Sequence, residues 1–192
     1  MEKSYLFESE RLGFRRWEDR DRHPFAVMSA DPEVMQYFPK LLEKEDAERL
    51  IDRFETHMDD KGYTMWAVEK KDDGTFIGFI GLLEITMAIR GQGDAEIGWR
   101  LDRRFWKQGY AVEGALACLA YAFETLNMAE IYSFTSIINK PSQTVMKRIG
   151  MTRVDEFNHP KLDASSPLKK HVLYKIDRRQ DGEKFNRSRG GR

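Results

Sequence analysis

Hydrophobic positions repeat with two different periods along the first half of the chain. In "ERLGFRRW" the apolar residues Leu12 and Phe14 alternate with other residues, which predicts a first strand. Between Glu43 and Lys61 apolar side chains return at helical spacing, so this segment is predicted to be an amphipathic helix that Gly62 ends. The run "YTMWAVEKKDDGTFIGFIGLLEI" holds the turn residues Asp72 to Gly74 between two β-prone segments, and it predicts a hairpin.

Two shorter helices are expected between the first strand and the amphipathic helix. Asp19 is predicted to cap a helix over "RDRHPFAVMSA", because a carboxylate at this position can accept hydrogen bonds from the first-turn amides. Asp31 and Pro32 then start a short helix that runs through Tyr37 and is stopped by Pro39.

The second half of the chain alternates strand-like and helix-like segments. Ala95 to Leu101 ("AEIGWRL") predicts a strand, and an apolar helix follows it to about Leu126. Ile131 to Ile138 is β-prone throughout, and "NKPSQTVMKRIG" predicts a helix with Asn139 as its cap and Pro141 in its first turn. The segments "TRVDEF" and "HVLYKID" are predicted to be two closing strands.

This succession predicts the order β-α-α-β-β-β-α-β-α-β-β, an α/β (α+β) fold whose mixed central sheet is flanked by helices. One domain is expected over residues 1–177, which is long enough for a sheet and several helices around one core. Residues 178–192 are polar and basic with no apolar period, and they are predicted to form a disordered tail.

Composition and charge restrict the class of protein. The 192 residues are 41% hydrophobic and 33% charged, as in soluble globular proteins. Lys plus Arg and Asp plus Glu both number 32, so no overall basic field exists to attract nucleic acid or a membrane surface. The longest apolar run, "ALACLAYAF", is too short to span a bilayer. The single cysteine, Cys118, is expected to be a small buried side chain; without an intrachain disulfide, a cytoplasmic location is predicted.

Common nucleotide-binding and hydrolase motifs do not occur in the sequence. It contains no G-x-G-x-x-G, no G-x-x-x-x-G-K-[ST] and no G-x-S-x-G. Its histidines show no ligand-like spacing, so no metal site is expected from His23, His57, His159 and His171.

The start of the helix after Leu101 carries the strongest candidate chemistry. The stretch "RFWKQGYAVEGA" (Arg104 to Ala115) places Gly109 at the helix start and Lys107 beside it. A helix N-terminus offers unpaired amides and the positive end of the helix dipole, and glycine lets phosphate oxygens approach the backbone. If the preceding strand separates from Ile131 to Ile138 beyond its end, its main-chain groups can pair with an amide-bearing ligand. Diphosphate plus an amide-bearing arm describes coenzyme A, although an ordinary tight turn would show the same pattern.

Two motifs at this separation resemble the GNAT acyltransferase superfamily, in particular its RimJ/RimL-like branch of protein N-terminal acetyltransferases. Within "EIGWRLDRRFWKQGYAVEGALACLAYAFETL", Trp106 to Ala111 matches the branch pattern W-x-x-G-x-A. Within "NKPSQTVMKRIGM", the pattern N-x-x-S followed by G-[FM] is matched by Asn139, Ser142, Gly150 and Met151. A strand of the form ERL-x-[LF]-R, here Glu10 to Arg15, also opens the family domain. The resemblance covers roughly residues 5–177 and implies the GNAT fold.

The resemblance implies acetyl-CoA as co-substrate and suggests which residues bind it. The backbone of Trp99 and Leu101 would pair with the pantetheine arm, to which Asn139 would also hydrogen-bond. The pyrophosphate would be held by backbone amides of Lys107, Gln108, Gly109, Tyr110, Ala111 and Val112. Trp106 is expected to pack under this loop rather than to contact the ligand.

Acetyl transfer to an amine needs an acceptor for the amine proton and a donor for the departing thiolate. Strand alternation places Glu96 and Arg100 on one face of their strand, and the Glu96 carboxylate is our candidate base. Glu84, at the end of the preceding strand, is the alternative base. Many GNAT members carry a tyrosine acid where this chain has Met146. Ser142, one turn earlier on the same helix, is therefore the candidate donor; a hydroxyl bonded to the backbone is the alternative interpretation.

The favoured function is an acetyl-CoA-dependent N-acetyltransferase, with a protein N-terminal α-amine as the expected acceptor. Acetylation of a small amine, such as a polyamine, an amino acid or an aminoglycoside-like antibiotic, is the second candidate. A non-catalytic module that binds acyl-CoA is the third. No metal, nucleic acid or membrane is expected to take part, and a homodimer is left open.

Overall fold

The computed structural model describes residues 5–87 and 93–178, which fall into two compact units. The first unit comprises Met1–Leu83 and Gly98–Cys118, and the second comprises Glu84–Ile97 and Leu119–Arg192. Strand β5 (Ala95–Leu101) and helix α4 (Tyr110–Glu124) each contribute residues to both units. From residue 179 onwards, the tail for which disorder is predicted lies outside the described residues.

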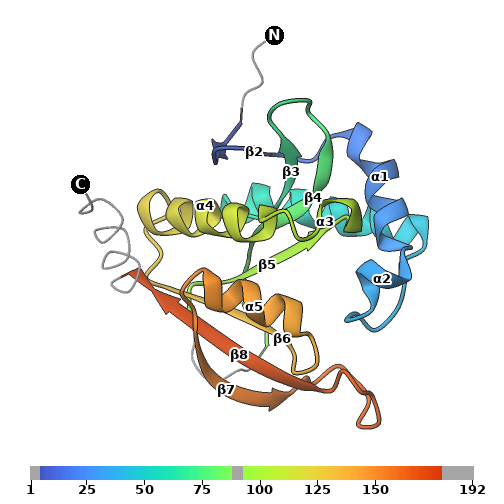
Figure 1. Ribbon diagram of the computed structural model, residues 1–192, viewed down its shortest axis with the longest axis vertical. Helices are drawn as coiled ribbons and strands as arrows, with labels where there is room; N and C mark the ends of the chain where they lie inside the picture. Colours follow the sequence, from blue (N-terminus) through green and yellow to red (C-terminus); the bar gives the residue numbers. More distant parts are fainter. Residues whose placement is uncertain (1–4, 88–92, 179–192) are drawn as a thin grey trace. The chain divides into compact units, whose positions relative to one another are not determined.

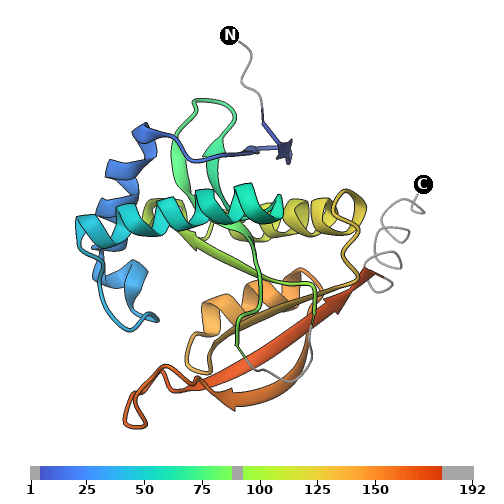
Figure 2. The same ribbon diagram turned by 180° about the vertical axis from the view of Figure 1, so that it is seen from behind.

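The first unit is a set of strands with helices on both faces (Figures 1 and 2), and its strands before Ala95 pair antiparallel with their neighbours. Its strands follow the order β1-β2-β3-β4-β5, with the bounds β1 Phe7–Glu8, β2 Leu12–Arg15, β3 Met65–Lys70 and β4 Phe76–Leu83. Its helices, besides the start of α4, are α1 (Asp19–Ser29), α2 (Pro32–Met35), α3 (Lys44–Lys61) and the 3-10 turn η1 (Arg103–Phe105). The hairpin and the long amphipathic helix predicted from the hydrophobic pattern are confirmed. The predicted element order is short by one strand and one helix, because the structure adds β1 and has three helices, α1 to α3, before β3.

Turn and cap residues explain where these elements end. Gly62 terminates α3 in the left-handed conformation (φ 78°), and Gly74 turns the β3–β4 hairpin with φ 74°, a backbone shape that glycine adopts without steric cost. Asp31 caps α2 by accepting a hydrogen bond from the Glu33 amide at 2.9 Å. The predicted cap of α1 is wrong: the N-cap is Glu18, and Asp19 is the first helical residue.

Helices α3 and α4 lie on opposite faces of the strands of the first unit (Figures 1 and 2). On the α3 face, the buried core joins aromatic side chains of several elements: Trp17, Phe25, Phe54 and Phe79. On the α4 face, a Cβ added at Gly114 would stand 2.4 Å from Ile80 and 3.2 Å from Leu12, so this glycine allows the helix to pack close to the sheet. Adjacent β4 residues Phe79 and Ile80 thus point to opposite helices, as strand alternation requires.

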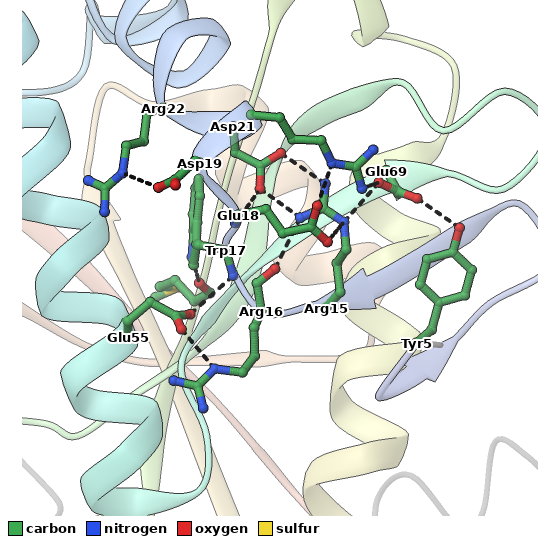
Figure 3. Close-up of polar contacts among 12 residues, drawn as sticks. Tyr5, Arg15, Arg16, Trp17, Glu18, Asp19, Asp21, Arg22, Glu55 and Glu69 are labelled. Atoms are coloured by element: carbon green, nitrogen blue, oxygen red, sulfur yellow. Dashed lines mark hydrogen bonds and ion pairs between the residues drawn. The ribbon is translucent and has the colours of Figure 1, made fainter. Parts of the chain in front are cut away.

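A buried ion-pair cluster links β2, α1 and β3 within the first unit (Figure 3). Arg15 donates to both oxygens of Asp21, at 2.6 and 2.9 Å, and to Glu69 at 2.8 Å. Arg20 reaches the same Glu69 oxygen at 3.0 Å, and the Tyr5 hydroxyl donates to its other oxygen at 2.9 Å. We call these five residues the Arg15 cluster.

The second unit combines parallel and antiparallel strand pairs, so the sheet is mixed as predicted. Its strand order is β5-β6-β8-β7, with β6 Glu130–Ser136, β7 Thr152–Asn158 and β8 Lys170–Asp177. Strand β5 runs parallel to β6, while β8 runs antiparallel to both β6 and β7. Helix α5 (Lys140–Arg148) connects β6 to β7, with Asn139 as its N-cap and Pro141 in its first turn.

Cys118 is fully buried on α4, as expected for a small apolar side chain, and burial raises the pKa of its thiol. Within the two described ranges, the helices are all too short or too polar to pass through a bilayer.

Candidate active-site elements

The loop before α4 has the backbone shape of an anion-binding turn. Lys107 and Gly109 both have positive φ angles, 61° and 86°. The amide of Glu113 bonds to the Gly109 carbonyl at 3.0 Å and so closes the first helical turn. The amides of residues 110–112 precede this bond, so no carbonyl of the helix is available to them. We call residues 106–112 the α4 cradle, because its amides and the positive end of the helix dipole can face an anion.

Arg11, which the sequence analysis did not single out, fastens the α4 cradle to the N-terminal segment. Its guanidinium donates to the Gln108 carbonyl at 3.1 Å and to the Glu113 carboxylate at 2.6 Å, and it lies 4.3 Å from the centre of the Tyr110 ring. Burial alone would raise the pKa of Glu113, but hydrogen bonds from Ser9 and Arg11 lower it. In the sequence, the position of Arg11 within the "ERL" motif is its only distinguishing feature, and it does not indicate a contact with the glycine loop.

The exposed backbone and the nearby cation of the α4 cradle fit a diphosphate. Gly109 is exposed, and a Cβ added to it would meet only the Arg11 guanidinium, at 3.4 Å. A ligand oxygen that approaches this backbone therefore also approaches a cation. Lys107 and Gln108 are exposed as well, so this part of the loop is open to a ligand from solvent.

The C-terminal end of β5 holds the residues expected to pair with pantetheine. Trp99 is half-buried and Leu101 is buried. The Leu101 carbonyl accepts a hydrogen bond from the Trp106 indole at 2.8 Å, so Trp106 fixes the loop to the strand end. Trp106 is itself 36% exposed, so its packing under the loop, away from the ligand, stays a prediction.

At the other end of β5, in the second unit, the strand pairs with β6 and holds the candidate base. The parallel register joins Glu96 to Tyr132, and one residue further the Ser133 hydroxyl donates to the Ile97 carbonyl at 2.8 Å. Glu96 is half-buried, and burial raises the pKa of its carboxyl group to about 7. Among the described residues its carboxylate has no hydrogen-bond or ion-pair partner. The rival base, Glu84, is exposed.

Asn139 and Ser142 meet at the start of α5. The Asn139 side chain accepts a hydrogen bond from the Ser142 amide at 3.2 Å and donates one to Thr135 at 2.9 Å. The hydroxyl of Ser142 makes no hydrogen bond within the described part of the chain, whereas Thr144 bonds back to the Lys140 carbonyl. Met146, at the position of the family tyrosine, is buried.

The predicted site residues thus form two groups. One group is the α4 cradle with Trp99 and Leu101 in the first unit, and the other is Glu96, Asn139 and Ser142 in the second. In the second unit a hydrogen bond joins Asn139 to Ser142. Across residues 5–87 and 93–178, no group of three or more His, Cys, Asp or Glu side chains could hold a metal ion.

Comparisons with known proteins identify the family. The family described as "Acetyltransferase (GNAT) domain" matches residues 11–152. The chain is 33% identical over 144 residues to YkkB of Bacillus subtilis, which covers 74% of this chain and 83% of that protein. It is 31% identical over 146 residues to the N-acetyltransferase YnaD of the same organism, covering 76% of this chain and 81% of that protein.

Solved structures show the same architecture. A GNAT-family acetyltransferase of Bacillus anthracis superposes with a TM-score of 0.74 at 26% identity, covering 89% of this chain and 97% of that chain. Spermidine N-acetyltransferase of Vibrio cholerae, solved with CoA and spermine, has a TM-score of 0.71 at 19% identity and covers 88% of this chain and 97% of that one. The chain belongs to the GNAT acetyltransferase family, has the mixed α/β fold of that family and is an acyltransferase.

Proposed function

We propose that this acyltransferase uses acetyl-CoA to acetylate a protein N-terminal α-amine, as in the RimJ/RimL-like branch of the family. The observation that carries the proposed chemistry is the environment of Glu96. Its half-buried carboxyl group has a pKa raised to about 7, so at neutral pH a large fraction is ionised and can still accept a proton. A carboxylate with an ordinary pKa would be a much weaker base at this pH.

In the proposed reaction, two side chains of this chain act on the reacting atoms, one at the amine nitrogen and one at the thioester sulfur. Acetyl-CoA supplies the acetyl group as a thioester. Glu96 takes the proton from the amine nitrogen as the new N–C bond forms, and the Ser142 hydroxyl donates a hydrogen bond to the sulfur as the C–S bond breaks. The amides of the α4 cradle hold the pyrophosphate. Asn139 donates one amide hydrogen to Thr135 and uses its second for the pantetheine arm.

The acceptor assignment rests on the sequence motifs and on the names of structural neighbours. A neighbour from Vibrio cholerae with 19% identity and a TM-score of 0.74 is described as a ribosomal-protein-serine acetyltransferase. The spermidine N-acetyltransferase among the neighbours favours a small amine as the second candidate. The W-x-x-G-x-A pattern at Trp106 to Ala111 favours the protein acceptor.

A first experiment tests the α4 cradle. Acetyl-CoA at one hundred times its dissociation constant should stabilise the wild-type protein by about 2.7 kcal/mol. Gly109→Glu places a carboxylate beside the site of the phosphate oxygens and should abolish this ligand-induced shift in melting temperature. Leu116→Glu, which adds the same charge at an exposed position of α4, is the matched control and should keep the shift. An undiminished shift in Gly109→Glu would show that the cradle assignment is wrong.

A second experiment identifies the acceptor. Acetyl transfer is measured as release of free CoA with a panel of unblocked peptides, their N-terminally blocked counterparts, and small amines that include spermidine. We expect the unblocked peptides to be the best acceptors. If spermidine or another small amine is turned over while every peptide is inert, the N-terminal assignment is wrong and the second candidate replaces it.

A further inference from the structure

Arg100 is a buried cation without an acidic partner among the described residues. Its side chain leaves β5 into the core of the first unit, and the residue is only 8% exposed. One guanidinium nitrogen donates a long hydrogen bond to the Ser29 hydroxyl at 3.3 Å, and the buried Nε has no hydrogen-bond partner. Burial lowers the pKa of Arg100 to about 10, so the group still carries its positive charge at neutral pH.

Aromatic rings make up most of the remaining surroundings of this guanidinium. Its central carbon lies 4.2 Å from the ring centre of Phe38, 5.2 Å from that of Phe79 and 6.0 Å from that of Phe25. Cation–π contacts compensate for part of the lost hydration of a buried charge, but a guanidinium has five N–H donors to satisfy. An arginine buried in this way is an unfavourable choice for packing alone, because methionine fills a similar volume without a charge.

Of the three rings around the guanidinium, Phe38 is the one that is exposed to solvent. It lies in the segment between α2 and α3 and is 37% exposed, in contrast to Phe25 and Phe79, which are buried in the core. Rotation of the Phe38 side chain would open the face of the guanidinium that this ring covers.

We propose that Arg100 binds a carboxylate of the acceptor substrate, so that this enzyme prefers amines that also carry an acidic group. The planar guanidinium can bind both oxygens of one carboxylate, and the Ser29 hydroxyl can donate to the same group. One cation balances one negative charge, which matches a carboxylate better than a doubly charged phosphate. A polycationic amine would be repelled. The proposal rests on the proposed function, since it specifies the acceptor of the same reaction.

The test compares pairs of unblocked peptides that differ only by Glu or Gln at the second or the third residue. For the wild-type enzyme we expect kcat/KM to be at least about tenfold higher with the Glu peptide, because a desolvated charge pair contributes strongly to recognition. Arg100→Met should remove this preference and leave the rate with the Gln peptide within about threefold. Arg100→Lys keeps the charge without the planar fork and should restore part of the preference.

Two controls separate this role from a general effect of charge or folding. Arg49→Met removes a positive charge from the exposed surface of α3, where Arg49 pairs with Asp46, and should keep the wild-type preference. The melting temperature of each variant shows whether it is folded. Binding of the Glu and Gln peptides without acetyl-CoA, followed by calorimetry, gives a second readout that needs no turnover.

The outcomes distinguish the two proposals. If the peptides are acetylated but Glu and Gln peptides react equally, or if Arg100→Met keeps the preference, the role of Arg100 is refuted while the proposed function stands. If no peptide is acetylated, the N-terminal assignment fails, and the same comparison is made between 4-aminobutyrate and butylamine. A preference for 4-aminobutyrate that is lost in Arg100→Met then supports the carboxylate site. Equal rates refute it.

Discussion

Two arginines buried in the same unit differ in what surrounds them. Arg15 on β2 and Arg100 on β5 are 6% and 8% exposed. Arg15 is bound by two carboxylates that are themselves buried, Asp21 and Glu69, whereas Arg100 contacts a hydroxyl group and three aromatic rings. The same side chain, equally shielded from water, is electrostatically satisfied in one place and unsatisfied in the other.

This difference separates a structural charge from a candidate binding charge. The Arg15 cluster connects the first-unit elements through short hydrogen bonds (Figure 3). Together with the Arg16 carbonyl, it gives each guanidinium nitrogen of Arg15 at least one acceptor. Because the charge of Arg15 is already paired with carboxylates of the protein, it has no need of a ligand. Glu96, by contrast, resembles Arg100: both are shielded, both lack an oppositely charged partner among the described residues, and both have pKa values shifted toward the neutral form by burial.

The largest expected effect comes from breaking the satisfied cluster. Arg15→Met leaves Asp21 and Glu69 buried without their main counter-charge, and we expect it to lower the free energy of unfolding by about 3–5 kcal/mol. Arg100→Met is the matched variant, because it removes the same side chain from an equally buried site that has no acidic partner. It should be neutral or stabilising. Urea unfolding of both variants measures the difference. Equal losses in the two would show that Arg100 is as much a structural residue as Arg15.

The next effect is a gain in stability from removing the buried carboxyl group of Glu96. Its pKa is raised from 4.5 in the unfolded chain to about 7 in the folded protein, so the folded state binds this proton more tightly. The free energy of unfolding should therefore fall as the pH rises from 4.5 to 7, by up to about 3 kcal/mol. Glu96→Gln should remove this fall and be more stable than the wild type at pH 8, with no difference below pH 4.

The same variant connects stability to chemistry. Glu96→Gln should lower turnover tenfold or more on a confirmed acceptor, and the wild-type rate should rise with pH through about 7 as Glu96 ionises. Glu84→Gln is the control, because Glu84 is exposed, and it should change neither the turnover nor the pH dependence of stability. If Glu84→Gln is the slow variant instead, Glu84 is the base and the assignment of this role to Glu96 is wrong.

The smallest effect tests the edge of the Arg15 cluster. Burial and the hydrogen bond to Glu69 raise the pKa of Tyr5 to about 12. Tyr5→Phe removes one hydrogen bond to a charged group and should cost about 1–2 kcal/mol in the free energy of unfolding. Tyr37→Phe removes a hydroxyl that makes no hydrogen bond among the described residues, and it should change stability by less than about 0.5 kcal/mol. If the two variants are alike, the Tyr5 contact does not contribute to the cluster.

Local features of the sequence were sufficient to predict most elements of the fold and the glycine-containing turn before α4. Gly62, Gly74 and Asn139 act within a few residues of their own position, so their cap and turn roles can be predicted from spacing. The cap of α1 was predicted at the wrong residue because Glu18 is a less common cap than Asp. Its backbone amide is satisfied by the Asp21 carboxylate three residues later, at 2.9 Å.

The two buried arginines could not be distinguished from the sequence. Arg15 is satisfied by residues 6 and 54 positions away, and the carboxylate of Glu69 comes from a strand that only the sheet register brings alongside. Strand alternation placed Glu96 and Arg100 on one face, but it says nothing of what covers that face. For Arg100 the cover is Phe38 together with two core rings. Arg11 was missed for the same reason, because its partner Glu113 is 102 residues away.

The burial of Cys118 determines how the proposed reactions can be measured. Acetyl transfer releases CoA with a free sulfhydryl. Thiol-reactive disulfides such as Ellman's reagent release a coloured product when they react with it. The chain has one sulfhydryl of its own, and that group is 0% exposed and held in its unreactive protonated form by burial. The folded enzyme should therefore give no background colour, and a slow signal from a variant incubated without acetyl-CoA would report unfolding.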